Sequence, residues 1–518
     1  MTSSKFLPKF FLAATFASAM LAALPAHNQA WAQKSKDTLR FPLGDAESSL
    51  DPYLLPGPFN NAWELSVWDS LLSFDSKNVK FAPLLAKSWS QPDPTIYEFE
   101  LRDDVKFHDG QTLDADDVVH TLNYLIDPKV NLRYKSSWNW IQSVEKLSQY
   151  KVRIKSKIPV PDGMMWMAYT SIYPEHIHAP LADKQAFGAK PVGSGPLKIA
   201  KIDKNTGIVA ERNSDFKAMG TKVAAGIGRV VAEPVPDVGT LVAKILTGSV
   251  DLARDLPADA VTSLKDSGQF EFTLAPDALA YSFFGFPSLG AQNVKALGDV
   301  RVRQAIVKAI NRPQLVEAQY GAVAKNNVKP FEGLCSKEQL GCGFTKEVPS
   351  YDPAGAKKLL AEAGYADGFD VVISTFPTNQ TEATAMSGML RAVGIRATVR
   401  IHLPAARVQQ LSQGKVDIGY YGWSGGGMFE ASPQIVRHFL SKEYDDPELT
   451  RMANETMTMT NDVDRRKAIA KVMDYAHDQA YVFPMIPIRA VYVHTKEVDL
   501  TNRDIRAGAI NAHEFSWK

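Results

Sequence analysis

The fold is decided by the segment Gly414-Lys-Val-Asp-Ile-Gly-Tyr-Tyr-Gly-Trp-Ser-Gly-Gly-Gly427. Its first half favours a β-strand, because it is rich in the side chains Val416, Ile418, Tyr420 and Tyr421. The glycines that follow end the strand and leave Trp423 at its carboxyl end. Ligands of open α/β sheets bind just outside the carboxyl ends of strands, so we expect Trp423 and a neighbouring tyrosine to contact a ligand. The alternative is a core aromatic at a strand end.

The same residues contain a second pattern, Gly422-Trp-Ser-Gly-Gly426, which matches G-x-S-x-G. In serine hydrolases this pattern forms a tight turn between a strand and a helix, with an acid and a histidine later in the chain. Such partners follow here at Asp445, Asp446, His477 and His494. Gly427 and Pro433 disfavour a helix directly behind the serine. An exported hydrolase using Ser424 is therefore the alternative function.

The composition is that of a globular protein. The chain has 518 residues, enough for two or three domains, of which 45% are hydrophobic and 22% charged. The formal net charge of +1 argues against nucleic acid or an anionic membrane as the main partner.

The N-terminus has the pattern of an export signal. Lys5 and Lys9 precede an apolar run over 10–24, and small residues at Ala30 and Ala32 predict cleavage after Ala32. The run is short for a membrane span, and no later apolar stretch reaches the ~18 residues that a span needs. We expect residues 1–32 to be a signal peptide and the mature protein to be periplasmic.

Cys335 and Cys342 are the only cysteines. In an oxidising compartment they predict one disulfide across a small loop, worth about 2–3 kcal/mol. Two cysteines are too few for a metal site, and the pair His176 and His178 lacks the spacing of a catalytic zinc helix. No metal and no cofactor are predicted.

Strands and helices alternate from about residue 230 to 423, which indicates an α/β architecture with much parallel sheet. The expected strands are 38–42, 95–101, 144–154, 197–202, 230–235, 250–252, 281–286, 369–375, 395–401 and the strand before Trp423. The expected helices are 61–72, 114–125, 238–245, 299–310, 353–364, 381–393, 405–411 and 464–479.

Several short stretches occur in the order and spacing of one family. They are Leu50–Pro52, Leu84–Trp89, Phe99–Gly110, Asp114–Val119, Gly193–Pro196, Asp299–Arg301, Ala309–Arg312, Tyr351–Pro353, Leu359–Gly364 and Gly414–Trp423. Over nearly its whole mature length the chain resembles the solute-binding proteins of peptide and nickel ABC importers, extracellular solute-binding family 5.

The resemblance implies a two-lobed periplasmic binding protein of type II, cluster C-like, with mixed sheets and a hinge. Lobe I would comprise 33–276 and 487–518, with an inserted subdomain at about 60–185, and lobe II would comprise 277–486. It also implies a monomer without enzymatic activity that delivers a small molecule to an ABC permease with ATPase subunits. A sensory or chaperone-like receptor on the same fold is a further alternative.

The ligand residues of dipeptide binders in this family are only partly present. Those proteins hold the peptide amine with an Asp shortly after Gly-Trp, followed by Asp-Pro, and they carry an Arg in the loop after the strand at 369–375. Here the corresponding positions read Ser424-Gly-Gly-Gly, Ser432-Pro433 and Thr375–Gln380. A buried peptide terminus without a counter-charge costs several kcal/mol. We therefore expect an oligopeptide bound through its backbone, an opine-like or modified amino acid, or a sugar.

Eight residues are the candidate ligand contacts. Arg254 ends a lobe I strand and presents a fork that can clamp a carboxylate or phosphate, although a salt bridge with Asp255 is the alternative. Glu430 is a candidate replacement for the missing Asp. The aromatic candidates are Tyr53, Tyr281, Phe283, Phe376, Tyr421 and Trp423.

Overall fold

The computed structural model describes residues 37–43, 48–54, 60–75, 77–132, 135–254, 256–275, 279–287, 294–324, 328–336, 338–423, 429–440, 444–500 and 511–518. Within these ranges no helix has both the length and the apolar character needed to cross a bilayer. The predicted signal peptide, its cleavage site after Ala32, and Ser424 lie outside the described residues.

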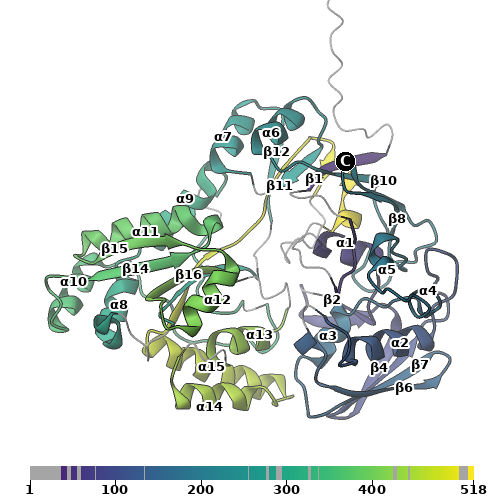
Figure 1. Cartoon of the computed structure of the whole chain (residues 1–518), viewed down its shortest axis with the longest axis horizontal. Helices are drawn as coiled ribbons and strands as arrows, with labels where there is room; N and C mark the ends of the chain where they lie inside the picture. Colours follow the sequence, from purple (N-terminus) through teal and green to yellow (C-terminus); the bar gives the residue numbers. More distant parts are fainter. Residues whose placement is uncertain are drawn as a thin grey trace, which may run out of the picture.

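One group of sheets is built from the first half of the chain and its C-terminal end; we call it lobe I (Figure 1). Its sheets are β1 (Thr38–Leu43)-β10 (Arg229–Pro234)-β9 (Gly207–Arg212)-β8 (Leu197–Asp203), β4 (Ala86–Asp93)-β5 (Ile96–Leu101)-β7 (Lys151–Ser156)-β6 (Ile141–Ser148), and β11 (Leu252–Arg254)-β18 (Val491–His494)-β12 (Glu271–Leu274). Two short pairs, β2 (Leu72–Asp75)-β3 (Lys80–Pro83) and β19 (Val498–Asp499)-β20 (Ser516–Trp517), complete them. The helices of this lobe are α1 (Asn60–Val67), α2 (Ala115–Ile126), α3 (Gly163–Tyr169), α4 (Glu175–His178), α5 (Ala186–Ala189), α6 (Val238–Leu246) and α7 (Ala258–Asp266).

The second group, which we call lobe II, has one mixed five-stranded sheet. Its order is β15 (Arg396–Ile401), β14 (Asp370–Thr375), β16 (Ile418–Trp423), β13 (Tyr281–Gly285) and β17 (Val482–Pro487). β14 runs parallel to β15 and β16, whereas β13 is antiparallel to β16 and β17. The helices are α8 (Val300–Lys308), α9 (Arg312–Ala324), α10 (Pro353–Glu362), α11 (Gln380–Ala392), α12 (Pro404–Ser412), α13 (Ser432–Ile435), α14 (Pro447–Thr456) and α15 (Asp462–Asp478), with a π-helical turn at Val436–Leu440.

Local sequence features explain many of these boundaries. Asp114 caps α2 in a capping box with Asp117, and Asp352 caps α10, which is followed by Gly364 at φ +85°. In each cap, a carboxylate oxygen accepts a hydrogen bond from a backbone N–H of the first helical turn, which has no partner within the helix. Gly321 breaks the helical geometry of α9 with φ +52°.

Two predicted elements were wrong in extent. The helix predicted over 61–72 ends at Val67, because the carbonyl of Val67 accepts from Gly195 N (2.9 Å), so a distant loop takes the place of the next turn. A Cβ at Gly193 would lie 2.0 Å from the same carbonyl, so that loop requires glycine there. The single strand predicted over 144–154 is a hairpin of β6 and β7, whose turn contains neither Gly nor Pro.

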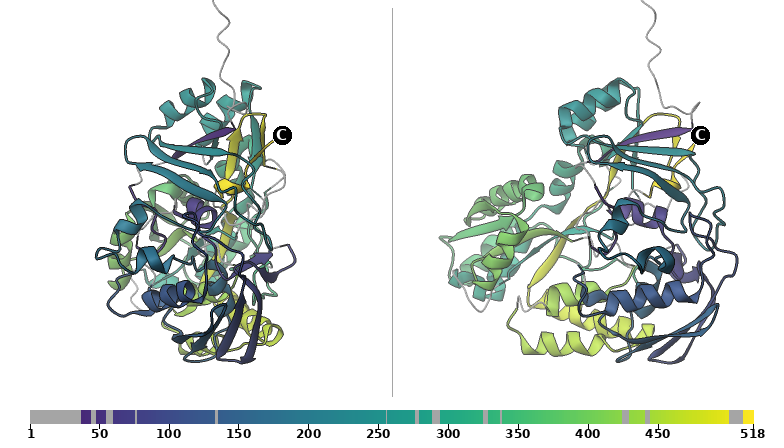
Figure 2. Two further views of the ribbon diagram at one scale, coloured as in Figure 1. Left: turned by 90° about the vertical axis from the view of Figure 1, so that its right-hand side faces the viewer. Right: turned by 45° about the vertical axis from the view of Figure 1, so that its right-hand side comes forward.

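Two chain segments connect the lobes and run side by side. Ala275 N donates to Ala490 O (2.9 Å), and Ile488 N donates to Ala280 O (2.8 Å). The views of Figure 2 show the yellow C-terminal segment passing from lobe II to the sheet that contains β11 and β12. A paired connection of this kind is a geometry on which two rigid lobes can rotate.

The lobes also meet at an apolar contact that includes Leu279 of the first connecting segment. Phe429 of lobe II stacks on Phe74 of β2 with ring centroids 5.1 Å apart, and it is only 5% exposed. Met165 and Trp166 of α3 pack in the same cluster. On the lobe II side, Leu340 N donates to Phe429 O (2.9 Å). Leu340 lies in the loop closed by the Cys335–Cys342 disulfide, whose predicted pairing is confirmed.

Candidate ligand-binding site

Three strands of lobe II end at one edge of the sheet. β14, β15 and β16 are parallel, and Thr375 is in register with Ile401 on one side and Tyr420 on the other. The residues just beyond these positions, Phe376, His402 and Tyr421, are therefore neighbours although they are far apart in sequence. The carboxyl ends of parallel strands are where ligands of α/β sheets bind.

The antiparallel strand β13 adds aromatic rings to this edge. Tyr281 is in register with Trp423, and Phe283 with Tyr421, so these four side chains lie on one face of the sheet. Their neighbour Tyr420 points to the opposite face and packs in the other core cluster of this lobe. The rings of Phe376 and Tyr421 lie 4.8 Å apart.

Basic side chains lie against these rings. The guanidinium of Arg407, from α12, lies 4.4 Å from the ring centre of Tyr421, and that of Arg437, from the π-helical turn, lies 5.4 Å from the ring centre of Phe283. His402 Nε2 lies 3.1 Å from the hydroxyl of Tyr421. We call the following eight residues the sheet-edge cluster: Phe283, Phe376, His402, Arg407, Tyr421, Trp423, Arg437 and His438.

The sheet-edge cluster has a buried floor and a partly exposed rim. Its floor is formed by Phe283, Tyr421 and His438. The rim members, which are half-buried, are Phe376, His402, Arg407, Trp423 and Arg437. Among the described residues, two buried polar atoms of the rim, Trp423 Nε1 and His402 Nδ1, have no hydrogen-bond partner. Buried polar groups almost always have partners, so these two nitrogens mark a place where a polar ligand is favoured.

The two histidines of the cluster have lowered pKa values. The pKa of His438 lies well below its ordinary value, because of burial and then the charges of Arg437 and Arg407. The pKa of His402 is lowered by burial and then by Arg407 and Arg400. Both imidazoles are therefore neutral near pH 7.

The structure brings together five of the eight predicted contacts. Trp423, Tyr421, Phe283 and Phe376 belong to the sheet-edge cluster. Tyr281 lies beneath it, fully buried, and donates from its hydroxyl to Leu334 O (2.6 Å). A tyrosine held in this way supports the floor of the cluster and does not face its rim.

The other three predicted contacts lie elsewhere. Glu430 is 1% exposed and accepts two bonds from Arg465 Nη2 (2.5 and 2.7 Å), so its charge is neutralised inside lobe II. Tyr53 is buried in lobe I, where its hydroxyl donates to Ser171 O (2.6 Å). Arg254 ends β11, half-buried, in register with Tyr492. Their predicted ligand contacts stay predictions.

Sequence reasoning missed the basic members of the cluster. His402 directly follows the strand at 396–401, so the rule about strand ends that selected Trp423 also selects His402. Arg407 lies one helical turn into α12, and no local sequence pattern indicates that it contacts a ligand. Arg437 and His438 lie in a π-helical turn, which no local pattern predicts; such turns are frequent at functional sites.

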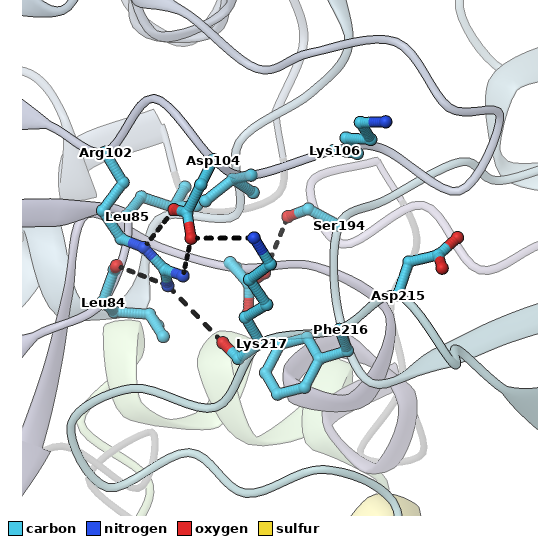
Figure 3. Close-up of a pocket in the computed structure, with 11 residues that line it drawn as sticks. Leu84, Leu85, Arg102, Asp104, Lys106, Ser194, Asp215, Phe216 and Lys217 are labelled. Atoms are coloured by element: carbon cyan, nitrogen blue, oxygen red, sulfur yellow. Dashed lines mark hydrogen bonds and ion pairs between the residues drawn. The ribbon is translucent and has the colours of Figure 1, made fainter.

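Two other parts of the structure hold polar groups that pair with one another. A pocket on lobe I is lined by Arg102, Asp104 and Lys217, but these charges pair with one another at 2.9 and 3.2 Å (Figure 3). Among the described residues, no group of three or more His, Cys, Asp or Glu is placed to hold a metal ion. His176 instead lies 2.7 Å from Asp109, and His120 lies 2.8 Å from His178.

Comparison with known proteins agrees with this geometry. A family model described as "Bacterial extracellular solute-binding proteins, family 5 Middle" matches residues 80–446, more than half of the chain. The heme-binding protein A of Haemophilus influenzae is 26% identical over 498 residues, covering 87% of this chain and 86% of that protein. The glutathione-binding protein GsiB of Escherichia coli is 23% identical over 474 residues, covering 88% and 90%.

A solved structure shows the same fold. The ABC transporter-associated periplasmic binding protein DppA of Helicobacter pylori, in complex with the peptide STSA, has a TM-score of 0.72 and 21% identity, and the match covers 94% of this chain and all of that one. The fold is therefore that of the two-lobed periplasmic binding proteins, with mixed sheets in both lobes, as predicted.

Proposed function

The chain belongs to family 5 of the bacterial extracellular solute-binding proteins, and we propose on this premise that it captures a small organic solute between its lobes and delivers it to an ABC importer. In this proposal the mature protein works in the periplasm, performs no chemistry, and has a permease and ATPase subunits as partners. The division at 276/277 and 486/487 into lobe I and lobe II is part of the proposal.

One observation supports the proposed location of the solute: the sheet-edge cluster lies at the carboxyl ends of β14, β15 and β16. It combines the half-buried rings of Phe376 and Trp423 with basic groups and two buried nitrogens without partners among the described residues. Small-molecule sites have this composition, an apolar lining with a few placed polar groups. The proposed contacts are Trp423, Phe376, His402, Arg407 and Arg437.

The solute is proposed to be a peptide or a peptide-like compound. The relatives found here are named for heme and for glutathione, and the structural neighbour holds a tetrapeptide. The opine-like and sugar alternatives remain within this proposal. The hydrolase alternative is not retained, because the family match extends across Ser424 and belongs to solute-binding proteins.

The proposal is tested with protein purified from its own periplasm. Native mass spectrometry should reveal a co-purified solute of one defined mass, and removal of that solute should lower the melting temperature by mass action. Trp423→Ala should lose most of the bound solute, whereas Trp89→Ala, on β4 of lobe I, should retain it. A protein that is solute-free in every preparation, and that no periplasmic extract stabilises, would contradict the proposal.

A further inference from the structure

We infer that α9 is a jointed link between the lobes, with its joint at Gly321. The part of the helix before Gly321 moves with lobe II, Val323 stays packed on lobe I, and rotation of the lobes changes the backbone angles of Gly321. This goes beyond the proposed function and takes from it only that the two lobes rotate.

The first argument is the position of α9, which contacts both lobes. Its neighbours in lobe II include α11 and β17, and its neighbours in lobe I include α7 and β12 (Figure 1). Val323, in the last turn, packs against two core clusters, of which one contains Met386 of α11 and the other contains Leu264 of α7. The helix therefore connects the lobes by packing, in addition to the two chain segments that join them.

The second argument is the break in the helix. Gly321 has φ +52° and ψ −137°, a combination that lies outside the regions open to residues with a Cβ. A regular helix across the lobe boundary would resist rotation, because hydrogen bonds hold each of its turns to the next. A kink at a glycine lets two rigid parts change direction about one residue. Gly321 thus supplies the freedom that a helix shared by two moving bodies needs.

The third argument is the side chain next to the joint. The hydroxyl of Tyr320 donates to Pro487 O (2.5 Å) and accepts from Arg489 N (2.8 Å). Arg489 Nε in turn donates to Ala275 O (2.6 Å), on the other connecting segment. Tyr320 is 6% exposed, so its bonds are shielded from water. Through Arg489, this tyrosine ties the end of α9 to both segments about which the lobes rotate.

The main test replaces Gly321 with alanine. A Cβ at this position would meet no heavy atom of the described residues within 4 Å, so the substitution restricts the backbone without crowding a neighbour. Alanine disfavours the angles of Gly321. The arrangement seen here, with Phe429 stacked on Phe74, should therefore lose population by about 5- to 100-fold relative to the open arrangement.

Pulsed electron double resonance on the solute-free mature protein measures this shift. Spin labels are attached to Lys155→Cys on β7 of lobe I and Lys357→Cys on α10 of lobe II, both exposed positions. The native cysteines are joined in a disulfide and do not take the label. We expect Gly321→Ala to move the distance distribution between the labels away from that of the wild type, and small-angle X-ray scattering to give a larger radius of gyration.

Matched controls separate the joint from general strain. Gly110 also has a positive φ, +92°, in an exposed turn of lobe I, and a Cβ there would likewise meet no described heavy atom within 4 Å. Gly110→Ala should leave the distance distribution unchanged. Tyr320→Phe keeps the ring but removes the tie to Pro487 and Arg489, so it should broaden the distribution. Its control is Tyr444→Phe, which removes a bond to Tyr481 O (3.1 Å) within lobe II and should not broaden it.

The inference is overturned if Gly321→Ala gives the distances of the wild type, or if it changes them no more than Gly110→Ala does. Should Gly321→Ala fail to fold, Tyr320→Phe decides: a distribution as narrow as that of Tyr444→Phe overturns the inference, and a broader one supports it. None of these measurements uses a solute, so such a failure leaves the proposed function intact. A native protein that never carries a solute would instead contradict the proposed function, whatever α9 does.

Discussion

Replacing Phe429 by alanine should favour the open arrangement of the two lobes. In the structure this ring fills a contact between lobe II and lobe I, stacked on Phe74 and packed near Met165 and Trp166. We expect rotation about the connections that pair at Ala275 with Ala490 and at Ala280 with Ile488 to expose the ring to water. The variant therefore removes a contact that exists only while the lobes are together.

The size of the effect follows from the burial. Phe429 is 5% exposed here, and burial of a phenylalanine side chain stabilises by about 1.5–3 kcal/mol, to which a ring stack adds about 0.5–1.5 kcal/mol. A loss of about 2–3 kcal/mol shifts the closed-to-open ratio by about 30- to 150-fold, since 1.4 kcal/mol is a factor of ten. Solute affinity should fall by up to the same factor, because a solute that needs the closed form must also compensate for this shift.

Small-angle X-ray scattering and calorimetry together test this reasoning. The solute-free variant should have a larger radius of gyration than the wild type, and saturating solute should bring the two values together. The control is Phe369→Ala: Phe369 is 9% exposed but packs within lobe II, at 5.6 Å from the ring of Tyr365. It should lower the melting temperature without changing the radius. If Phe429→Ala scatters like the wild type and binds solute equally well, the contact has no part in closure.

Three further predictions concern stability. Burial lowers the pKa of His178 to about 3, so folding stability should be lost as pH falls from about 6.5 toward 3, at about 1.4 kcal/mol per pH unit. In His178→Phe, the melting temperature should depend less on pH in that window. Arg465→Met should cost about 3–5 kcal/mol in urea unfolding, because it leaves Glu430 buried without a counter-charge, and the double variant with Glu430→Met should recover most of this. Reduction of the Cys335–Cys342 disulfide, which spans seven positions, should cost about 2 kcal/mol, as measured by unfolding with and without reductant.

The elements with strong local patterns could be predicted from the sequence. α2 begins where Asp114 and Asp117 form a capping box, and β13, β14 and β16 coincide with runs of apolar residues. Where a distant segment ends an element, the local pattern misleads. The helical spacing continues past Val67, but Gly195 binds the carbonyl there and the chain turns into β2.

The aromatic half of the candidate site could also be predicted, because Trp423 ends a strand and Phe376 directly follows one. The basic half could not, since Arg437 belongs to a π-helical turn and Arg407 to a helix whose orientation depends on tertiary packing. Glu430 shows the opposite case: its place in the sequence suggested a ligand contact, but the guanidinium of Arg465, 35 residues later, neutralises it. Charged residues separated in sequence give no local sign that they are paired.

The positions of Trp423 and Phe429 suggest how solute binding and lobe contact are coupled. Trp423 ends β16 at the rim of the sheet-edge cluster, and six positions later Phe429 contacts lobe I, backed by Leu340 in the disulfide-closed loop. A solute held against Trp423 therefore lies one short segment from the contact that joins the lobes. We expect each site to bias the same two-state rotation, and such coupling is reciprocal: whatever stabilises the Phe429 contact should then raise solute affinity by the same factor.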